Sequence, residues 1–435
     1  MTRTRLIVPA ASGAALLALT GIGVVFQVED DPERFLAVAL LQGAVYAIAV
    51  WTMWNGGSSR RLVLGIVALA VLMRIPVILA PPYLSTDVYR YVWDGRVIAA
   101  GINPYRYVPL DPQVAPLRDT EIFPNINRSD TAVTIYPPFA QAIFLVVTRV
   151  SESVTAMKAA MVVGEIITFV LLLRLLAGEG LPASRVVVYA WHPLPLWEFA
   201  GSGHIDAALI ALVMGAFWAA RRGQGLAGLF LAGATLTKLY PVILLPALYR
   251  RWGCALPVVF AAAIAVGYLP FIGVGWRVFG FLPGYAGEEG FDTSGAGFYL
   301  LSLLHELPPF AALNGRAYVI GAAAILLALG AAIAVARYPA RGSLGAAALL
   351  AATFMFLVSP HYPWYFAWLI PFACLIRSPA LLWLTIACLL LYLVPVGYHV
   401  VRDDYRLVIE SLIYGPFAAL AAADLWYHCR VIRSS

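Results

Sequence analysis

The sequence predicts an all-α integral membrane protein, a multi-helix bundle of about 12–14 transmembrane spans that forms a single domain over residues 1–435. Composition is the first reason. The chain is 62% hydrophobic and 12% charged, with a mean hydropathy of +0.84, whereas about a quarter of the residues in soluble domains are charged. The second reason is a series of apolar runs of spanning length. The third is that arginines gather at the ends of these runs.

The first apolar run, from Arg5 to Phe26, lacks a small-residue cleavage site followed by a polar chain. We therefore expect a retained helix and not a removed signal peptide. Further runs follow along the chain by length and hydropathy. The expected spans are 6–27, 34–54, 62–80, 155–177, 184–200, 204–220, 225–250, 254–272, 316–337, 343–358, 363–376, 379–397 and 405–428.

The arginine clusters at the span ends predict the orientation. If they all lie in the cytoplasm, the large loop 81–135 and a second loop, 275–315, both fall on the outer side. This topology has two conditions. Residues 136–150 must enter the membrane or lie along it without crossing, and the run 225–250 must turn back at a break in 237–241. Both places contain proline, which removes a backbone donor and interrupts a helix.

Lysine occurs only at Lys158 and Lys238, and arginine supplies the rest of the 29 Lys and Arg residues. This bias is typical of a GC-rich bacterial gene. We therefore expect a multi-pass protein of the bacterial plasma membrane, with its active site facing away from the cytoplasm.

The loop 81–135 opens with a short predicted helix of about fourteen residues. Ser85 or Thr86 is a suitable N-cap, and Gly101 is a suitable residue to end the helix. Such a helix would lie on the membrane surface. At helical spacing, one face carries Asp87, Arg90, Tyr91 and Asp94.

Each carboxylate on this face also has an ordinary structural interpretation. Asp87 could be a helix-start carboxylate that the helix dipole stabilises. Asp94 could be the partner of Arg90 on a solvated face. The dense pattern of polar and aromatic residues after a membrane span nevertheless favours function, because loops on a rigid scaffold often carry the active site.

Three further polar features lie on the same outer side in the expected topology. His204 and Asp206 begin a span after a glycine turn, and Asp206 could merely cap that helix. Lys238 stands at the proline break, where it could extend to the interface or bind a phosphate. His361 could belong to an aromatic belt. Together with the 81–135 loop, these features predict one aqueous site.

Charge and cysteine spacing exclude other classes. The net charge of +6 comes from arginines at helix ends and forms no basic stripe, so we expect no nucleic-acid partner. The four cysteines, Cys254, Cys374, Cys388 and Cys429, lie far apart in apolar context, without a metal-binding spacing. No dense acidic cluster favours a metal. We therefore predict no cofactor and no bound metal, although a divalent metal is not excluded.

Five motifs together resemble a known family. The motifs are Asp87-Val-Tyr-Arg-Tyr-Val-Trp-Asp-Gly-Arg with Gly101-Ile-Asn-Pro-Tyr105, then Tyr136-Pro-Pro, Gly203-His-Ile-Asp206, Leu236-Thr-Lys238-Leu-Tyr-Pro and His361-Tyr-Pro-Trp-Tyr365. They are similar to the polyprenyl-phosphate-sugar-dependent glycosyltransferases of the GT-C class, and most of all to an actinobacterial mannosyltransferase-like branch. The resemblance covers nearly the whole chain.

The resemblance implies a GT-C type membrane bundle with a catalytic aspartate in an early extracytoplasmic loop. It implies transfer of a hexose, preferably mannose, from a polyprenyl-phosphate donor, with inversion at the sugar carbon. The acceptor would be a glycan, a lipoglycan or a protein, and the lipid bilayer is the further partner. In this family the aspartate usually follows the first span, whereas here two further spans precede it.

The candidate site follows from the resemblance and the topology. Asp87 would be the general base for the acceptor hydroxyl, and Asp94 or Asp206 would be a second carboxylate. Lys238, with Arg90, His204 or His361, would stabilise the phosphate that leaves. The candidate residues for binding the donor phosphate or sugar are Arg90, Lys238, His204, His361, Tyr91, Tyr136 and Arg96.

Two other functions remain open from the sequence. A transporter or flippase of a lipid-linked sugar could use the same cavity, but transporters often consist of matching halves, and no repeat is present. A catalytically inactive protein that only binds a lipid-linked sugar is the other possibility.

Overall fold

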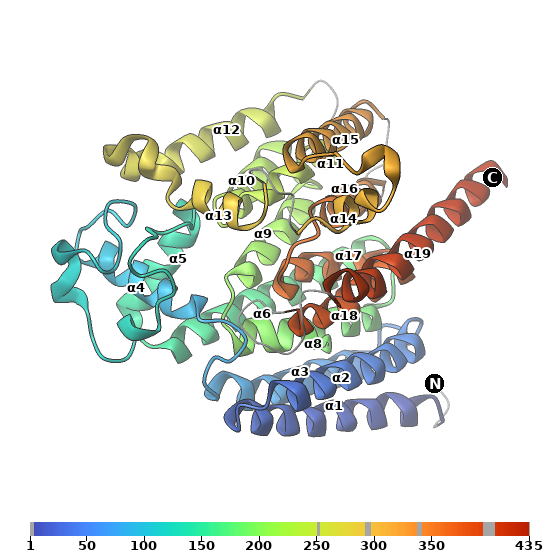
Figure 1. Cartoon of the computed structure of the whole chain (residues 1–435). Helices are drawn as coiled ribbons and strands as arrows, with labels where there is room; N and C mark the ends of the chain where they lie inside the picture. Colours follow the sequence, from blue (N-terminus) through green and yellow to red (C-terminus); the bar gives the residue numbers. More distant parts are fainter. Residues whose placement is uncertain (1–3, 250–252, 292–296, 337–341, 395–404, 435) are drawn as a thin grey trace.

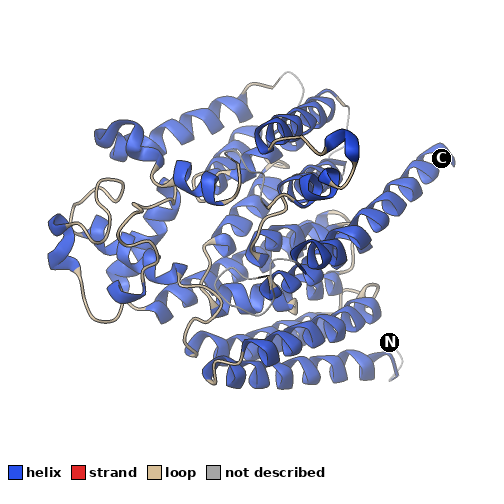
Figure 2. Ribbon diagram, in the orientation of Figure 1, coloured by secondary structure: helices blue, strands red, loops and turns tan. Residues whose placement is uncertain are grey.

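The computed structural model describes residues 4–249, 253–291, 297–336, 342–394 and 405–434. These residues form helices, turns and loops, and none of them lies in a β-strand (Figure 2). The prediction of an all-α protein is therefore confirmed.

Three long helices form the N-terminal part of the bundle and run side by side (Figure 1). Asp31 begins the second of them, because its side chain accepts a hydrogen bond from the backbone of Arg34 at 3.0 Å. Pro76 lies inside the third. The helices are α1 (Thr4–Val28), α2 (Pro32–Met53) and α3 (Arg60–Leu79).

The polar loop after α3 contains the predicted short helix. Helix α4 (Asp87–Ala99) ends before Gly101, whose φ of +77° is the left-handed conformation that glycine adopts most easily. Two short 3₁₀ turns follow, η1 (Pro112–Leu117) and η2 (Phe123–Asn125). The amphipathic helix α5 (Pro138–Val150) then packs against α4.

The centre of the bundle is α9 (Asp206–Ala219), whose residues are nearly all buried between α6 (Val154–Gly178) and α10 (Gln224–Thr235). Figure 1 shows α6 and α9 in the middle of the molecule. Because α9 is apolar on nearly all sides, its sequence predicts a membrane span. Its burial shows that it faces other helices on most of its surface.

The predicted span 184–200 differs from the structure. The segment consists of η3 (Ala183–Val186), α7 (Val187–Ala190), α8 (Pro193–Pro195) and the π-helical turn η4 (Leu196–Gly201). Prolines at 193 and 195 remove two backbone donors and interrupt the helix. The segment is almost wholly buried, so neighbouring helices surround the irregular backbone.

The two breaks predicted from proline meet in space. Helix α10 ends at Thr235, and the chain continues through η5 (Tyr240–Leu244) and α11 (Leu245–Leu248). The backbone N–H groups of Phe139 and Ala140, at the start of α5, donate to the carbonyl oxygen of Leu236 at 2.9 and 3.2 Å. The free N–H groups at the start of α5 and the free carbonyl oxygen after α10 therefore satisfy each other.

The expected boundary between a span at 254–272 and an outer loop at 275–315 is shifted. Helix α12 (Ala255–Tyr268) continues directly into η6 (Leu269–Phe279), which bends at Gly275. The region that follows is also partly helical. It contains α13 (Leu282–Glu288), α14 (Tyr299–His305) and η7 (Pro308–Phe310) before α15 (Gly315–Val335).

The C-terminal elements complete the bundle. They are α16 (Gly342–Val358), η8 (Pro363–Leu369), α17 (Ile370–Leu375), α18 (Pro379–Ala387), η9 (Cys388–Leu393) and α19 (Arg406–Ser434). The turn η8 packs on α9. The last part of the predicted span 379–397 lies outside the described residues.

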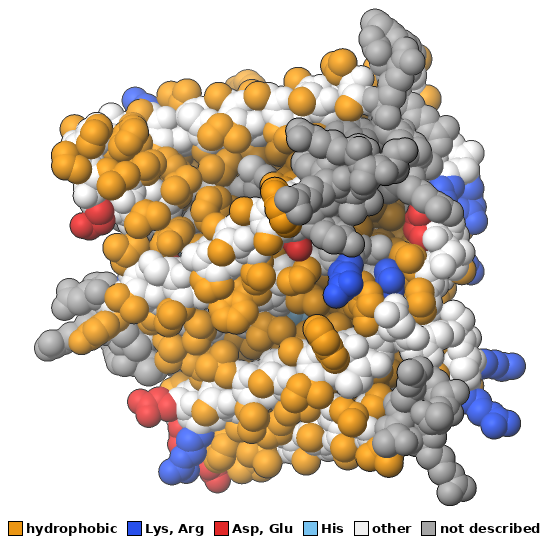
Figure 3. Space-filling view, turned by 90° about the vertical axis from the view of Figure 1, so that its right-hand side faces the viewer, with side chains coloured by type: hydrophobic (Ala, Val, Ile, Leu, Met, Phe, Trp, Pro, Cys, Tyr) orange, Lys and Arg blue, Asp and Glu red, His pale blue; other side chains and the backbone are white. Residues whose placement is uncertain are grey.

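In the described part of the chain, seven helices are long and apolar enough to cross a membrane, and five shorter apolar helices accompany them. The long ones are Ile7–Val28, Pro32–Met53, Arg60–Leu79, Val154–Gly178, Ala255–Glu288, Gly315–Val335 and Arg406–Trp426. Hydrophobic side chains cover most of the face in Figure 3, and charged side chains lie mainly toward its edges. The protein is a multi-pass membrane protein by its helices.

Candidate active site

Asp87 begins α4 and is half-buried. Its backbone N–H donates to Oγ of Ser85 at 3.2 Å, so Ser85 satisfies one of the free donors at the helix start. The carboxylate has two neutral partners. Nδ2 of Asn127 donates to Oδ1 at 3.0 Å, and the hydroxyl of Tyr136 donates to Oδ2 at 2.9 Å. Each oxygen keeps a lone pair for a further donor.

Asp94, two turns along α4, is 2% exposed. Thr134 Oγ1 and Gln141 Nε2 both donate to its Oδ2, the latter at 3.0 Å, and Arg90 Nε lies 3.8 Å from its Oδ1. Burial raises the pKa of Asp94, and Arg90 and the two hydrogen bonds act in the opposite direction. The sequence interpretation of a solvated face is wrong, because the segment 127–141 covers it.

Arg90 is buried and holds the covering segment in place. Its guanidinium donates to the carbonyl oxygen of Ala132 and lies beside Asp94. These contacts use its donors inside the protein. The structure therefore gives Arg90 a scaffolding position, one turn away from Asp87.

Tyr91 and Tyr136 form an aromatic wall beside Asp87. Tyr91 is fully buried and stacks on Phe144 with 4.5 Å between ring centroids, and the two tyrosine hydroxyls lie 3.4 Å apart. Burial raises the pKa of Tyr91, and the charge of Asp87 and then that of Asp206 act in the same direction. Tyr91 is thus within electrostatic reach of both carboxylates.

Arg96 points away from this wall. It donates to Glu152 at 2.8 Å and to Asp119 at 2.6 Å, and it also bonds the carbonyl oxygen of Leu117 at 2.9 Å. Partial burial opposes the ionisation of Asp119, but the hydrogen bond from Arg96 and two from the backbone lower the pKa of Asp119 to about 2. Arg96 anchors the loop and is not brought to Asp87.

Lys238 lies at the break after α10 and is paired with Asp206. Its Nζ donates to Oδ2 of Asp206 at 2.6 Å, and the hydroxyl of Tyr240 donates to Oδ1 at 3.0 Å. The same Nζ lies 4.7 Å from the ring centroid of Tyr365. The Lys238 side chain is 12% exposed and that of Asp206 is 1% exposed. The cation is therefore the accessible member of the pair.

His204 is fully buried behind this pair. Its Nδ1 lies 3.0 Å from Oε2 of Glu198, in an orientation that is not that of a hydrogen bond. The His204 ring stacks on Trp364 at 4.2 Å, and Trp364 stacks in turn on Tyr362 at 4.3 Å. A π-helical turn carries Glu198, and such turns occur often at functional sites.

His361 lies on the rim, where Nδ1 is 3.2 Å from Oε2 of Glu289. Burial lowers the pKa of His361 to about 4, and the charge of Arg406 adds to the effect. The imidazole is therefore neutral near pH 7. The pKa of the neighbouring Tyr362 is raised to about 12. Burial is the main cause and the charge of Glu289 is the next, and the charge of Asp87 also contributes.

The structure thus groups the sequence candidates into two sets. Asp87, Tyr91 and Tyr136 form one set, and Asp206, Lys238 and His204 form the other. Asp94, Arg90 and Arg96 hold the loop in place. Sequence reasoning gave no role to five residues that the structure places at the candidate site or one contact away from it. Tyr240 and Tyr365 lie inside the quoted motifs and contact Asp206 and Lys238. No motif spacing marks the other three, Asn127, Arg128 and Tyr285.

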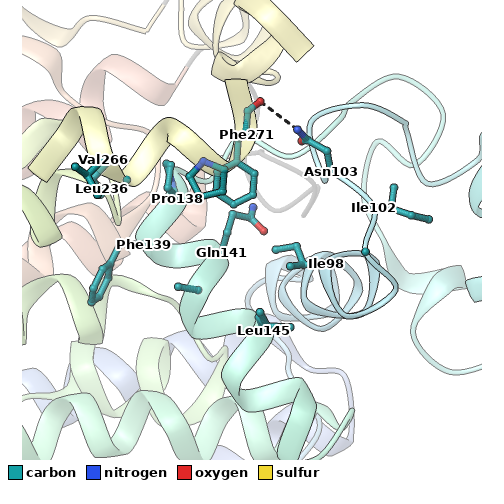
Figure 4. Close-up of a pocket in the computed structure, with 14 residues that line it drawn as sticks. Ile98, Ile102, Asn103, Pro138, Phe139, Gln141, Leu145, Leu236, Val266 and Phe271 are labelled. Atoms are coloured by element: carbon teal, nitrogen blue, oxygen red, sulfur yellow. Dashed lines mark hydrogen bonds between the residues drawn. The ribbon is translucent and has the colours of Figure 1, made fainter. Parts of the chain in front are cut away.

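A groove of about 530 Å³ opens near the C-terminal end of α4, the end opposite to Asp87. It lies between the end of α4, α5 and the α12–η6 helix, and its walls are mostly apolar (Figure 4). Gln141, which donates to Asp94, lines the groove. Asn103 and Phe271 line it as well, and Nδ2 of Asn103 donates to the carbonyl oxygen of Phe271 at 3.1 Å. Val266, on the α12 side, is 62% exposed, so this wall continues onto the apolar surface.

Within the described ranges, no three His, Cys, Asp or Glu residues are grouped in a way that could hold a metal ion. The cysteines at 254, 374 and 388 are free thiols. Lys238 supplies positive charge next to Asp206, and Arg128 lies within electrostatic reach of Asp87.

Comparison with known proteins identifies the family. The model of the alpha-(1->6)-mannopyranosyltransferase N-terminal domain matches residues 6–254, which include α1 to α11 and both carboxylate sets. The chain belongs to this mannosyltransferase family. The mannosyltransferase-like branch and the glycosyltransferase class predicted from the motifs are therefore confirmed.

One curated relative is a probable alpha-(1->6)-mannopyranosyltransferase of Mycolicibacterium smegmatis. It is 30% identical over 126 residues, which cover 25% of this chain and 22% of that protein. The chain thus aligns with about a fifth of the relative's length. No solved structure matches this chain significantly.

Proposed function

We propose that this protein transfers mannose from a polyprenyl-phosphate donor to an acceptor hydroxyl on the outer side of the bacterial plasma membrane, with inversion at the anomeric carbon. The observation that carries the proposal is the arrangement of two opposite charges. A half-buried carboxylate with neutral partners, Asp87, lies within electrostatic reach of Tyr91, and so does Asp206, which is paired with the accessible cation Lys238. Family membership supports the choice of mannose.

Asp87 is the proposed general base. The acceptor oxygen forms a bond to the anomeric carbon while its proton passes to the Asp87 carboxylate. The bond from the anomeric carbon to the phosphate oxygen breaks, and its electron pair leaves with the phosphate. Asn127 and Tyr136 orient the carboxylate by neutral hydrogen bonds and do not neutralise it with a cation.

Lys238 is the proposed phosphate ligand. The leaving phosphate gains negative charge as the bond breaks, and a fixed ammonium group nearby stabilises that charge. The pairing with Asp206 holds the ammonium at the break between α10 and η5. Because the protein itself supplies this cation, we expect transfer to survive the removal of divalent metals with a chelator.

The apolar groove beside α5 is the proposed path of the polyprenyl chain. Its volume suits part of a lipid chain, and its wall on α12 continues onto lipid-facing surface. Gln141 connects this groove with the Asp94 network that supports α4. The acceptor would approach from the aqueous side and carry its hydroxyl on a glycan, a lipoglycan or a protein.

Purified protein in detergent tests the proposal. It is incubated with labelled polyprenyl-phosphate-mannose and a mannoside acceptor, and the product is identified by mass spectrometry. A transferase forms a labelled product in detergent, whereas transport requires a sealed membrane and an inactive binder forms no product. Parallel incubations with other polyprenyl-phosphate hexoses test the choice of sugar.

The matched pair Asp87→Asn and Asp111→Asn tests the assignment of the base. Asp111 lies in the same loop and also begins a short helix, where its side chain accepts from the backbone of Gln113 at 2.9 Å. Asp87→Asn should reduce transfer by about 10²–10⁴-fold, and Asp111→Asn should retain it. Full activity of Asp87→Asn would contradict the role of Asp87.

A further inference from the structure

Helix α13 is a short rigid element between two glycines in the left-handed region. Gly280 precedes it with a φ of +59°, and Gly290 follows it with a φ of +77°. Side chains other than glycine rarely adopt these angles, and glycine enters and leaves them at low cost. None of the seven residues of α13 is buried. The helix is therefore held by its polar contacts more than by apolar packing.

One end of α13 is attached to the segment that holds Asp87. The backbone N–H of Phe281 donates to the carbonyl oxygen of Thr134 at 3.2 Å. At the other end of the helix, Arg128 donates to Glu288 through two hydrogen bonds of 2.8 and 2.6 Å. Asn127, which donates to Asp87, is the residue next to Arg128 in the chain.

The opposite side of α13 is attached to the region that holds Lys238. The hydroxyls of Tyr285 and Tyr365 lie 2.6 Å apart. Tyr365 is the residue whose ring faces Nζ of Lys238 at 4.7 Å. Glu289, directly after the helix, lies 3.2 Å from His361. Figure 1 shows α13 between the loop region of α4 and α5 and the helices α14 and α16.

We propose that α13 is a hinged cover over the site, and that its closure sets the positions of both Asp87 and Lys238. Arg128 and Tyr285 are then positioning residues, because each links α13 to a side chain that contacts a reacting group. This inference rests on the function proposed above. Closure of α13 after the acceptor enters then aligns the base and the cation, so that acceptor entry and this alignment are coupled.

The ion pair between Arg128 and Glu288 is the contact of the cover that opens most easily. Its side chains are 37% and 39% exposed, and solvent screens ion pairs of this kind. The contact between Glu289 and His361 is more buried, with side chains 10% and 13% exposed. A cover that opens in each cycle needs at least one weak contact, because a latch that is buried throughout would slow substrate entry and product release.

The first test removes single latch contacts. Glu288→Gln and Tyr285→Phe each lose one contact, and kcat/KM for the acceptor should fall by about two- to fivefold. The thermal midpoint should stay unchanged, because α13 buries no side chain. Glu152→Gln is the matched control, since the Glu152 side chain is 47% exposed and its Oε2 lies 2.8 Å from Arg96, away from α13. Its activity should equal that of the unmodified protein. Unchanged kcat/KM in both latch variants would overturn the proposal.

The second test locks the cover. A variant with Arg128→Cys and Glu288→Cys, and with Cys429 and the exposed Cys254 replaced by serine, is joined by a bifunctional methanethiosulfonate reagent. Turnover should fall by at least about tenfold and return after dithiothreitol. Variants that carry only one of the two introduced cysteines should show no such loss on treatment. Equal turnover before and after cross-linking would overturn the proposal.

The rate of cross-linking separates a failure of the cover from a failure of the proposed function. Cross-linking needs no turnover, and polyprenyl phosphate alone should accelerate it by favouring the closed position. Absence of mannose transfer by the unmodified protein would count against the proposed function. A cross-linking rate that polyprenyl phosphate leaves unchanged would count against the cover.

Discussion

The two ends of the candidate site hold their carboxylates in different ways. At the α4 end, Asp87 is half-buried and accepts hydrogen bonds from the neutral groups of Asn127 and Tyr136. At the α9 end, Asp206 is fully buried, and its charge is balanced by Lys238 at 2.6 Å. The first carboxylate is held by neutral hydrogen-bond donors, and the second is paired directly with a cation.

This difference separates the two chemical roles within one site. A group that takes a proton from an acceptor must be reachable and must not already be neutralised by a cation. A group that positions a lysine takes no proton from the acceptor, so it can be buried, and a buried carboxylate needs a paired cation. Asp87 fits the first description and Asp206 fits the second, although both are aspartates at the first position of a helix.

Substitution of each aspartate by asparagine tests this division most directly. Asp87→Asn should lower kcat by about 10²–10⁴-fold, because the base is lost. Asp206→Asn changes the partner of Lys238 but keeps the base, so its kcat should fall less than that of Asp87→Asn. Initial rates at saturating donor measure both. If Asp206→Asn proved the more severe, the two roles would have to be exchanged.

The stability of the α4 end should depend on Asp94 and little on Asp87. Asp94→Ala leaves Arg90 buried without its carboxylate, which should cost about 3–5 kcal/mol. Asp87→Ala loses two hydrogen bonds at a half-exposed position and should cost about 1–2 kcal/mol. Thermal unfolding of the purified variants in detergent gives the comparison. Equal midpoints would show that the buried network does not support α4.

Acid should destabilise the rim of the α9 end. The pKa of His361 is about 4 in the folded protein, below its ordinary value of about 6.5. The unfolded chain therefore binds the proton more readily. The contribution of His361 is fully present above about pH 6.5 and is lost as the pH falls toward 4, by up to about 3 kcal/mol. His361→Gln should flatten this part of the stability profile, and an unchanged slope would contradict the assignment.

Lys238→Ala should weaken donor binding, and it should also lower the free energy of unfolding, because it leaves the buried Asp206 without its cation. Loss of a charge-assisted contact to phosphate costs about 1.5–3 kcal/mol, or about 10–150-fold in Kd. Asp206→Asn is the matched comparison, since it keeps the ammonium but removes the carboxylate that positions it, and it should weaken donor binding less than Lys238→Ala. Equilibrium binding of polyprenyl phosphate measures both. Equal affinity of Lys238→Ala and the unmodified protein would remove Lys238 from the phosphate site.

Local sequence signals predicted α4 well and predicted its surroundings poorly. Capping residues, glycine placement and helical spacing are local, and they placed Asp87 and Asp94 on one face with Gly101 after the end. The environment of that face depends on Thr134 and Gln141, which lie 40 and 47 positions from Asp94 in the chain. No pattern within α4 reveals that a later segment covers it.

The broken segment 183–201 shows the same limit. Its hydropathy matches that of a span, so length and composition favour one helix. The prolines indicated a possible interruption, but only the surrounding helices decide whether irregular backbone can be buried at that depth. The bundle buries nearly all of this segment, and a broken helix is therefore stable there.

The amino-acid sequence by itself determined that this chain is a helical membrane protein of the mannosyltransferase family, with an aspartate at the start of a helix in its first large loop. These properties depend on composition, local spacing and motifs. The tertiary structure decided which polar groups meet: Asn127 with Asp87, Asp206 with Lys238, and α13 with both regions. Such pairings join residues far apart in the chain, and their strength depends on burial that only the packed bundle creates.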